Sequence, residues 1–190
     1  MTEKQFLKEV LMQKDVCEAI KENLDELICL IPEIKDAVGF DHQNPAHMFD
    51  VWGHTLYALG LSKPNFIVRC SLLFHDLAKP QSAVRGRDGY LHYSGHQAKS
   101  SEIAKRCLTN MGFNQEEIEK ICYIIALHDN YITDDEVKEN PNLQKLRLDV
   151  QICDAFAHTK AAADRRIDYL NDRKKYIKNF LKNMNKKTPC

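Results

Sequence analysis

Apolar residues recur at steps of three and four along most of this chain, and that spacing restricts the fold to one built from α-helices. Residues 3–31 show the pattern first, with apolar side chains at positions 6, 10, 11, 16, 20, 24, 27, 28 and 31, and Pro32 ends or interrupts it. One face of an α-helix repeats every ~3.6 residues, so this row predicts an amphipathic helical segment. Seven Gly and six Pro in 190 residues offer little turn chemistry for a sheet of many short strands. We therefore expect an all-α fold.

Capping residues and helix breakers predict where the middle helices begin and end. Asp50 can cap a helix over 51–61, and the next helix is expected over 65–78, before Pro80. The segment 80–94 combines Pro, Gly and charged residues and predicts a loop of the kind that often carries function.

The second half of the chain carries similar signals. Ser94 can cap a helix that runs to about residue 111 and ends at Gly112, and Asn114 can cap the next. Residues 142–182 predict two helices or one long helix with a bend.

Charge and cysteine usage predict a soluble protein of the cytoplasm. Lys plus Arg equals Asp plus Glu at 27 each, so the overall charge favours neither nucleic acid nor a membrane as partner. The seven cysteines form no Cys-x-x-Cys pair and fall mostly in apolar helical patterns, which predicts reduced thiols. No stretch has the signal-peptide pattern or the ~20 apolar residues of a membrane span.

The adjacent pair His75-Asp76 closes the apolar run Cys-Ser-Leu-Leu-Phe at 70–74. Burying a carboxylate without a partner is costly, and a metal ion would engage both the Asp and the neighbouring imidazole. Helical spacing directs further polar groups from separate helices toward the interior, namely His54, His96, His128 and Asp154.

Each of these groups also has a structural interpretation. A single His on an apolar face is usually a hydrogen-bonded core residue, and Asp154 could pair with Arg147 or Arg165 instead of a metal. Convergence of several such groups from separate helices favours the metal site.

These residues carry a resemblance to a known family. His54, His75-Asp76 and Asp154, in that order on a helical background, resemble the His…His-Asp…Asp signature of the HD-domain metal-dependent phosphohydrolase superfamily. The chain is most similar to the HD domain of bacterial tRNA nucleotidyltransferases and poly(A) polymerase relatives, through residues 40–56, 70–80, 92–96 and 153–158.

The resemblance spans about residues 40–160 and implies a compact multi-helix HD-domain bundle with a metal site between helices. It predicts one domain over residues 1–190, in which the helical segment 1–35 and a helix at about 160–185 pack on that core. The chain shows no Gly-Ser plus Asp-x-Asp pattern of a nucleotidyltransferase module, so CCA addition and polyadenylation are not expected. Gly53 stands where the family commonly has a larger polar residue, which alters the surroundings of the neighbouring His but not the ligand type.

The resemblance also implies a set of ligands. His54, His75, Asp76 and Asp154 would hold a first ion. His96 and His128 would hold a second ion bridged by Asp76, or would bind substrate or orient water beside a single ion. Mixed imidazole and carboxylate ligands suit Mn, Fe, Ni, Co or Zn, and suit Mg less well.

The implied reaction is hydrolysis of a phosphate ester or phosphodiester of a nucleotide-like substrate. Bound metal lowers the pKa of water from ~15.7 toward ~7 and so supplies hydroxide at neutral pH. The expected catalytic residues are Asp76 and Lys79; the expected substrate contacts are Lys79, Arg85, Arg87 and His92; and the expected supports of the ligands are His47 and Asp50. Without the resemblance, Lys79 is equally well interpreted as an ordinary lysine at a helix end. Arg85, Arg87 and His92 are equally well interpreted as solvated side chains of a loop.

Three hypotheses about function follow. The first is a metal-dependent phosphohydrolase acting on a small phosphorylated substrate, a nucleotide in particular, with 2′,3′-cyclic phosphodiesterase activity as one option. The second is an RNA-binding or RNA-end-processing accessory, which the neutral net charge disfavours. The third is a non-catalytic helical module with a structural metal. A closed site would favour the third, because structural metals lack an open coordination position.

Overall fold

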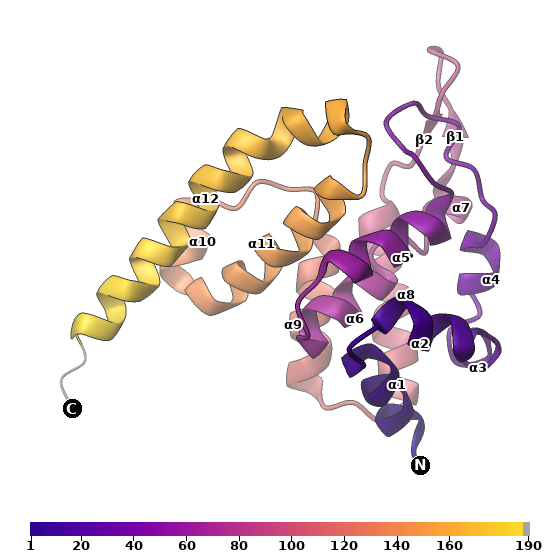
Figure 1. Ribbon diagram of the computed structural model, residues 1–190, viewed down its shortest axis with the longest axis horizontal. Coiled ribbons are helices and arrows are strands. Elements are labelled where there is room, and N and C mark those ends of the chain that lie inside the picture. The colour runs from indigo at the N-terminus through magenta and orange to yellow at the C-terminus, as the bar shows by residue number, and fades with distance from the viewer. Residues whose placement is uncertain (188–190) are drawn as a thin grey trace.

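The computed structural model describes residues 1–187, with side chains to residue 184, and within that part the chain forms twelve helices and one short hairpin (Figure 1). The all-α prediction is therefore confirmed. The helices are α1 (Glu3–Met12), α2 (Val16–Glu22), α3 (Leu24–Leu30), α4 (Ile34–Ala37), α5 (Val51–Leu61), α6 (Phe66–Phe74), α7 (Lys79–Ser82), α8 (His96–Asn110), α9 (Gln115–Ala126), α10 (Asp134–Glu139), α11 (Pro141–Phe156) and α12 (Lys160–Lys187). The strands β1 (Val84–Arg85) and β2 (Leu91–His92) pair antiparallel.

Helix α6 lies at the centre of the main core. It packs against α1, α5, α8, α9 and α11, and its residues Leu72, Leu73 and Phe74 are fully buried. Burying one such side chain contributes about 1.5–3 kcal/mol, so this short apolar helix holds the surrounding helices together. Its last residue, Phe74, brings the chain to the His75-Asp76 doublet deep inside the protein.

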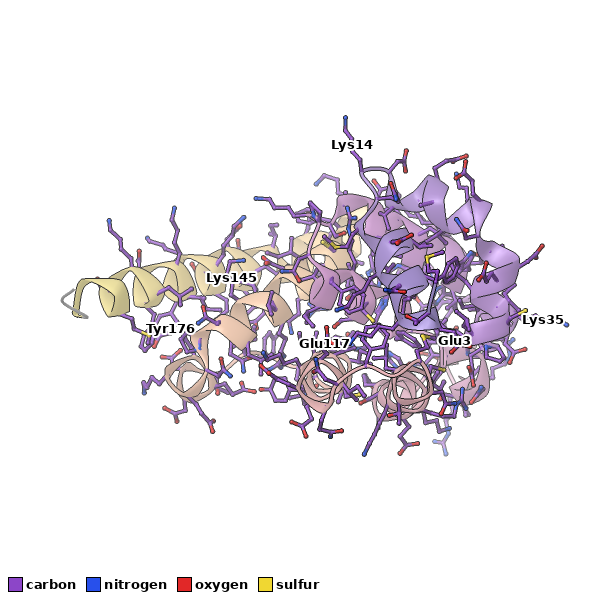
Figure 2. The ribbon with its side chains drawn as sticks, turned by 90° about the horizontal axis from the view of Figure 1, so that it is seen from below. Glu3, Lys14, Lys35, Glu117, Lys145 and Tyr176 are labelled. Carbon is purple, nitrogen blue, oxygen red and sulfur yellow. The ribbon has the colours of Figure 1, made fainter. Side chains whose placement is uncertain are left out.

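A second, smaller core lies between α10, α11 and α12. Figures 1 and 2 show these helices extending to one side of the main body, with Lys145 on α11 and Tyr176 on α12. α12 packs along α11, and α11 in turn packs on α5, α6 and α9. The buried apolar residues of this core are Ile132, Val137, Leu148, Ala155, Leu170 and Ile177. Helix α11 therefore belongs to both cores.

The N-terminal segment is helical as predicted, but the apolar row over residues 3–31 is divided among α1, α2 and α3. Asp15 interrupts the row because its side chain accepts a hydrogen bond from the Glu18 amide and so starts α2. Asn23 separates α2 from α3, and its amide donates to the Ala19 carbonyl. The apolar spacing survives both breaks because all three helices face the same core.

Several predicted helix ends are confirmed and others are wrong. Asp50 and Asn114 cap α5 and α9 as expected. The residue before α8 is Gly95 in the left-handed region (φ 79°) and not a capping Ser94. The helix expected over 65–78 stops at Phe74, because tight turns follow it, with the Leu77 amide donating to the Phe74 carbonyl at 3.2 Å.

The remaining predictions concern the loop and the last helices. The expected loop over 80–94 contains part of α7 and the β1–β2 hairpin, because short-range turn bonds such as that from the Gly86 amide to the Tyr90 carbonyl order it. Residues 142–182 form two helices, α11 and α12, which is one of the two alternatives.

Two further features of the described residues match the expectations. Six cysteines are free thiols, and Cys190 lies outside the described residues. In the part of the chain described, no helix combines the length and the apolar character needed to cross a membrane.

Candidate metal centre

Asp76 lies at the middle of a group of imidazoles and carboxylates contributed by α5, α8, α11, the end of α6 and the turn after α9. His75 is the C-terminal cap of α6, and its amide donates to the Ser71 carbonyl at 2.9 Å. The chain then turns, with the Lys79 amide donating to the Asp76 carbonyl at 2.9 Å. The helix end and the turn point both side chains of the doublet inward, where Asp76 is 1% exposed.

One side of Asp76 faces a group formed by His54, His75 and Asp154. Asp76 Oδ2 lies 3.3 Å from His75 Nε2 and 3.6 Å from His54 Nε2. Asp154 Oδ1 lies 3.0 Å from His54 Nε2 and 3.5 Å from His75 Nε2. All four side chains are buried, and the structure therefore brings together the four residues predicted to hold the first ion.

The other side of Asp76 faces His96 and His128. Asp76 Oδ1 lies 3.2 Å from His96 Nε2 and 3.9 Å from His128 Nε2. Asp76 thus directs one oxygen toward each pair of histidines. This is the arrangement that a carboxylate bridging two ions requires.

All four histidines use one ring nitrogen to bind the backbone, which orients the other nitrogen toward the carboxylates. The Nδ1 donations are His54 to the Ala157 carbonyl (3.3 Å), His75 to Leu72 (2.7 Å), His96 to Tyr93 (2.8 Å) and His128 to Ile125 (2.7 Å). A carbonyl only accepts, so Nδ1 carries the proton and a neutral ring keeps a lone pair on Nε2. Metal-binding histidines characteristically have such a backbone partner.

Asp76 lacks the hydrogen bonds that a buried carboxylate ordinarily has. Neither of its oxygens accepts a hydrogen bond of normal angular geometry, although the Lys79 ammonium lies 2.7 Å from Oδ2. His96 Nε2 is likewise buried without a hydrogen-bond partner. Unpaired buried polar atoms are costly, and a cation between them would remove that cost.

Electrostatics within the centre keep its carboxylates ionised. Burial opposes ionisation of Asp76, but the charges of His75 and Lys79 hold its pKa well below the ordinary value. Burial likewise opposes ionisation of Asp154, and its contacts with His54 and His75 hold its pKa low. Burial disfavours the cationic form of His75, yet the two carboxylates raise its pKa to about 9. Without a cation, these charges therefore favour a proton on the His75 imidazole.

The residue types present fit a transition-metal ion. His54, His75 and Asp154 each offer a ligand atom, as do Asp76, His96 and His128, and in each group these atoms lie within 4.8 Å of one another. Imidazole nitrogen with carboxylate oxygen suits Mn, Fe, Co, Ni or Zn. These buried clusters could hold a metal ion, and its type and number remain predictions.

Asp129 is a further carboxylate at the centre that the sequence predictions missed. Its Oδ2 lies 3.5 Å from His128 Nε2 and 3.7 Å from His96 Nε2, and it accepts a hydrogen bond from the Gln97 amide at 2.8 Å. The side chain is 38% exposed, so this edge of the centre reaches solvent. His128-Asp129 repeats the doublet of residues 75–76, and that repetition was the signal available in the sequence.

Arg166 is the arginine that approaches Asp154, and the alternative in which Arg147 or Arg165 pairs with Asp154 is wrong. Arg166 Nη1 lies 3.5 Å from Asp154 Oδ2 and 3.8 Å from Asp129 Oδ1. Arg165 is one step around α12 and donates to the Ala161 carbonyl instead.

Arg147 has a structural role at the start of the second core. Fully buried, it donates to the Leu127 carbonyl at 3.0 Å and the Asn130 carbonyl at 2.8 Å, and it forms an ion pair with Glu136 at 2.8 Å. Gln151 adds a bond to the His128 carbonyl at 2.9 Å. Helix α11 thereby holds the backbone of the stretch that carries the second His-Asp doublet.

Two of the three expected substrate contacts on the hairpin, Arg85 and His92, are engaged locally. Arg85 donates to the Gly89 carbonyl at 2.6 Å and also to the side chain of Gln43, and His92 pairs with Asp88 at 2.9 Å. Arg87 lies in the turn between the two strands. These contacts connect the hairpin to itself and to Gln43, and a role in substrate binding stays a prediction.

The two expected supporting residues differ in position. Asp50 accepts from the Gly53 amide at 2.6 Å and the Gly39 amide at 2.7 Å, so it starts α5 and fixes the backbone before His54. His47 lies beside His54 itself, with ring centroids 5.6 Å apart.

His47 belongs to a cluster of imidazoles next to the centre. Its ring stacks on His42 with centroids 3.5 Å apart, and it lies 4.5 Å from the ring of His158. His158 lies 4.8 Å from His54 and donates from Nδ1 to the Asp154 carbonyl at 2.8 Å. Burial lowers the pKa of His42 to about 3 and that of His47 to about 2, with the Lys79 charge adding to both. His42 and His158 were not predicted.

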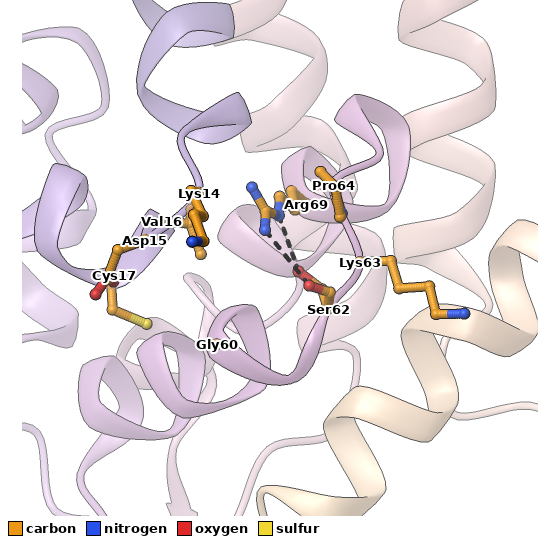
Figure 3. Close-up of a pocket in the computed structure, with 9 residues that line it drawn as sticks. All are labelled: Lys14, Asp15, Val16, Cys17, Gly60, Ser62, Lys63, Pro64 and Arg69. Carbon is orange, nitrogen blue, oxygen red and sulfur yellow. Dashed lines mark hydrogen bonds between the residues drawn. The ribbon is translucent and has the colours of Figure 1, made fainter.

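A cavity of about 780 Å³ lies away from these ligands, at the C-terminal end of α5 (Figure 3). Lys14, Lys63 and Arg69 contribute its cationic side chains. Arg69 is nearly fully buried and donates to the Leu11 carbonyl at 2.7 Å and to Ser62 Oγ at 3.1 Å. Its donors are therefore used to join α1 to the α5–α6 connection.

Comparison with known proteins gives one informative similarity. No protein-family model matches the chain. The chain is 29% identical over 104 residues to a CC-adding tRNA nucleotidyltransferase of Thermus thermophilus. The match covers 52% of this chain and 24% of that protein, so the chain spans about a quarter of its relative's length.

Proposed function

We propose that this protein is a metal-dependent phosphohydrolase of the HD-domain type, which hydrolyses a phosphate ester or phosphodiester of a nucleotide-like substrate. The position of Asp76 is the observation that carries the proposal. Its two oxygens face two separate pairs of histidines at 3.2–3.9 Å and accept no well-formed hydrogen bond. The similarity to a tRNA nucleotidyltransferase supports a nucleotide-related substrate.

The ligands have defined parts in this proposal. His54, His75 and Asp154 would hold one ion, His96 and His128 would hold the other, and Asp76 would bridge them. Metal bound there would lower the pKa of coordinated water and supply hydroxide near neutral pH. The four histidines keep Nε2 directed inward through their Nδ1 bonds to backbone carbonyls.

In this proposal two cations of the chain, Lys79 and Arg166, would bind the phosphate. The Lys79 ammonium, 2.7 Å from Asp76 Oδ2, provides positive charge where negative charge grows on the phosphoryl oxygens. Arg166 on α12 approaches Asp154 and Asp129, and its side chain is 25% exposed, so its guanidinium can engage a phosphate from the solvent side. The exposed edge at Asp129 gives substrate access, which favours a catalytic over a closed structural site.

The proposal is tested by metal content and activity together. Elemental analysis of the purified protein should give two transition-metal ions per chain. A panel of nucleotide mono- and diesters, including 2′,3′-cyclic nucleotides, should identify a substrate that is hydrolysed. The His75→Ala/Asp76→Ala variant should stay folded by circular dichroism and lose both metal and activity. Full activity in that variant would overturn the proposal.

An RNA-end-processing role is the second candidate, favoured by the similarity to a tRNA nucleotidyltransferase. In that case the same centre would act on the terminal phosphate of an RNA. Binding of tRNA should then weaken steeply with salt, because contacts to phosphates release counterions. A flat salt response together with hydrolysis of free nucleotides would exclude this candidate. A centre that binds metal but hydrolyses neither class of substrate would indicate a non-catalytic module.

A further inference from the structure

Three imidazoles next to the metal centre are close enough to share one ion. His47, His54 and His158 each offer a ligand atom, and the three atoms lie within 4.8 Å of one another. In tetrahedral coordination with metal–nitrogen bonds of ~2.1 Å, the ligand nitrogens are about 3.4 Å apart. The three imidazole nitrogens would therefore need to move only modestly closer together to bind one ion. The ring centroids lie 4.5 Å apart for His47 and His158 and 4.8 Å apart for His54 and His158.

The backbone fixes these rings in place. His47 and His158 face each other through an isolated antiparallel β-bridge, and His158 Nδ1 donates to the Asp154 carbonyl at 2.8 Å. Because Nδ1 carries the donated proton, a neutral His158 ring has its free lone pair on Nε2. The bridge thus joins the loop before α5 to the segment after α11, at the point where the side chains of His47 and His158 meet.

Unpaired buried nitrogens support a ligand here. His47 Nδ1 has no hydrogen-bond partner, and neither nitrogen of His42 has one, although His42 is only 1% exposed and stacks on His47. Buried polar atoms without partners are uncommon in folded proteins. An ion bound through His47 Nδ1 would engage one of these atoms.

We propose that His47, His54 and His158 form an alternative site for a transition-metal ion such as Zn²⁺, which competes with the metal centre for the imidazole of His54. Imidazole ligands suit zinc, and the carboxylate of Asp154 lies 3.8 Å from His158 to offset the positive charge. A neutral imidazole has one lone pair, so His54 serves one ion at a time, and binding the second ion through Nδ1 would replace its hydrogen bond to the Ala157 carbonyl. Occupation of the alternative site therefore removes a ligand from the centre, and this consequence rests on the proposed function.

Crystallography at the zinc absorption edge tests the site. Crystals of the metal-free His75→Ala/Asp76→Ala variant, which lacks two ligands of the centre, are soaked in Zn²⁺. We expect an anomalous peak bounded by His47, His54 and His158. If that variant does not fold, metal-free crystals of the single variant His75→Ala, which lacks one ligand of the centre, should show the same peak after the same soak. Zinc found at the other histidines but never among these three overturns the inference.

Equilibrium dialysis against Zn²⁺ provides a solution measurement. Adding His47→Gln/His158→Gln to the same variant should weaken zinc binding at least about tenfold, whereas adding His92→Gln, which removes an exposed imidazole on the hairpin, should leave it unchanged. An unchanged affinity in the His47/His158 variant overturns the inference. The two proposals fail separately: zinc among the three imidazoles with no hydrolysis overturns only the proposed function, and hydrolysis with zinc confined to the centre overturns only the alternative site.

Discussion

Arg166 Nη1 lies 3.5 Å from Asp154 Oδ2, so a cation near the start of α12 is set against a buried carboxylate of α11. The same guanidinium lies 3.8 Å from Asp129, the exposed carboxylate of the centre. Arg166 therefore lies where the buried candidate ligands meet solvent. A phosphate entering there would meet a planar donor able to form two parallel hydrogen bonds.

Arg166→Gln is expected to weaken substrate binding. Hydrogen bonds to charged groups are worth about 1.5–3 kcal/mol, so KM should rise roughly 10- to 100-fold, with a smaller change in kcat. Steady-state kinetics on the substrate found in the nucleotide panel measures both. Arg165→Gln is the matched control, because that neighbouring side chain bonds to its own helix. Equal effects from the two variants would remove Arg166 from substrate binding.

Asp129→Asn is expected to lower the affinity for one of two ions. The carboxylate lies 3.5 Å from His128 Nε2 and supplies negative charge on that side of Asp76 only. Loss of a group that orients metal ligands typically lowers affinity about 10- to 100-fold. The metal-to-chain ratio is measured after dialysis at a series of decreasing free metal concentrations. In the variant, one ion should be lost at a higher free metal concentration than in the wild type. Asp135→Asn, at an exposed position on α10, is the control and should keep both ions.

Metal removal is expected to destabilise the fold. The candidate ligands join α5, α6, α8, α11 and the turn after α9, so an ion binds the folded chain far better than the unfolded one. At a free metal concentration of about 100 times Kd this adds ~2.7 kcal/mol. For a chain of this length that corresponds to roughly 5–10 °C in Tm. Thermal unfolding with and without a chelator measures the shift, and identical curves would show that no stabilising ion is bound.

Glu117 is expected to make stability depend on pH at the acidic end. Burial opposes its ionisation, but Lys8 at 2.6 Å and Lys4 at 3.0 Å hold its pKa below the ordinary value. A lowered pKa means that the stabilisation is full above the unfolded value of ~4.3 and is lost as pH falls through the folded value.

Glu117→Gln should consequently lower the free energy of unfolding by about 0.5–1 kcal/mol at pH 7, since partly exposed ion pairs are weak. The difference from wild type should shrink at pH 3. Urea unfolding at both pH values measures it. Glu116→Gln removes the neighbouring carboxylate, which is 78% exposed, and should change little at either pH. A gap that is the same at both pH values would show that the charge of Glu117 is not responsible.

The sequence predicted the fold class and the residues around the doublet better than it predicted their surroundings. Apolar spacing identified the helical regions because, among the described helices, all except the short α7 contribute buried apolar residues to a core. The four first-ion candidates do meet, although His54 and Asp154 are 100 residues apart. Helical spacing predicted only that each faces the interior, and the family resemblance grouped these four around one ion. Local spacing cannot report such a contact.

The misses have physical causes. The helix predicted over 65–78 ends at Phe74, where the chain turns and the His75-Asp76 doublet faces inward. The apolar spacing of the sequence gives no signal for that turn. Arg166 and Arg165 are adjacent and chemically identical, so only the rotation of α12 decides which one reaches Asp154. His42 and His158 each contact His47 through loop geometry, which no helical period describes.

Helix α11 carries Asp154 and also holds the backbone behind His128 through Gln151 and Arg147. One helix therefore positions both halves of the centre relative to each other. A one-residue insertion midway along α11 would rotate everything beyond it by about 100° relative to the residues before it. Asp154 would then move away from His54, while Arg147 kept its carbonyl partners. The number of residues in α11 between 147 and 154 therefore determines whether the two halves of the centre meet.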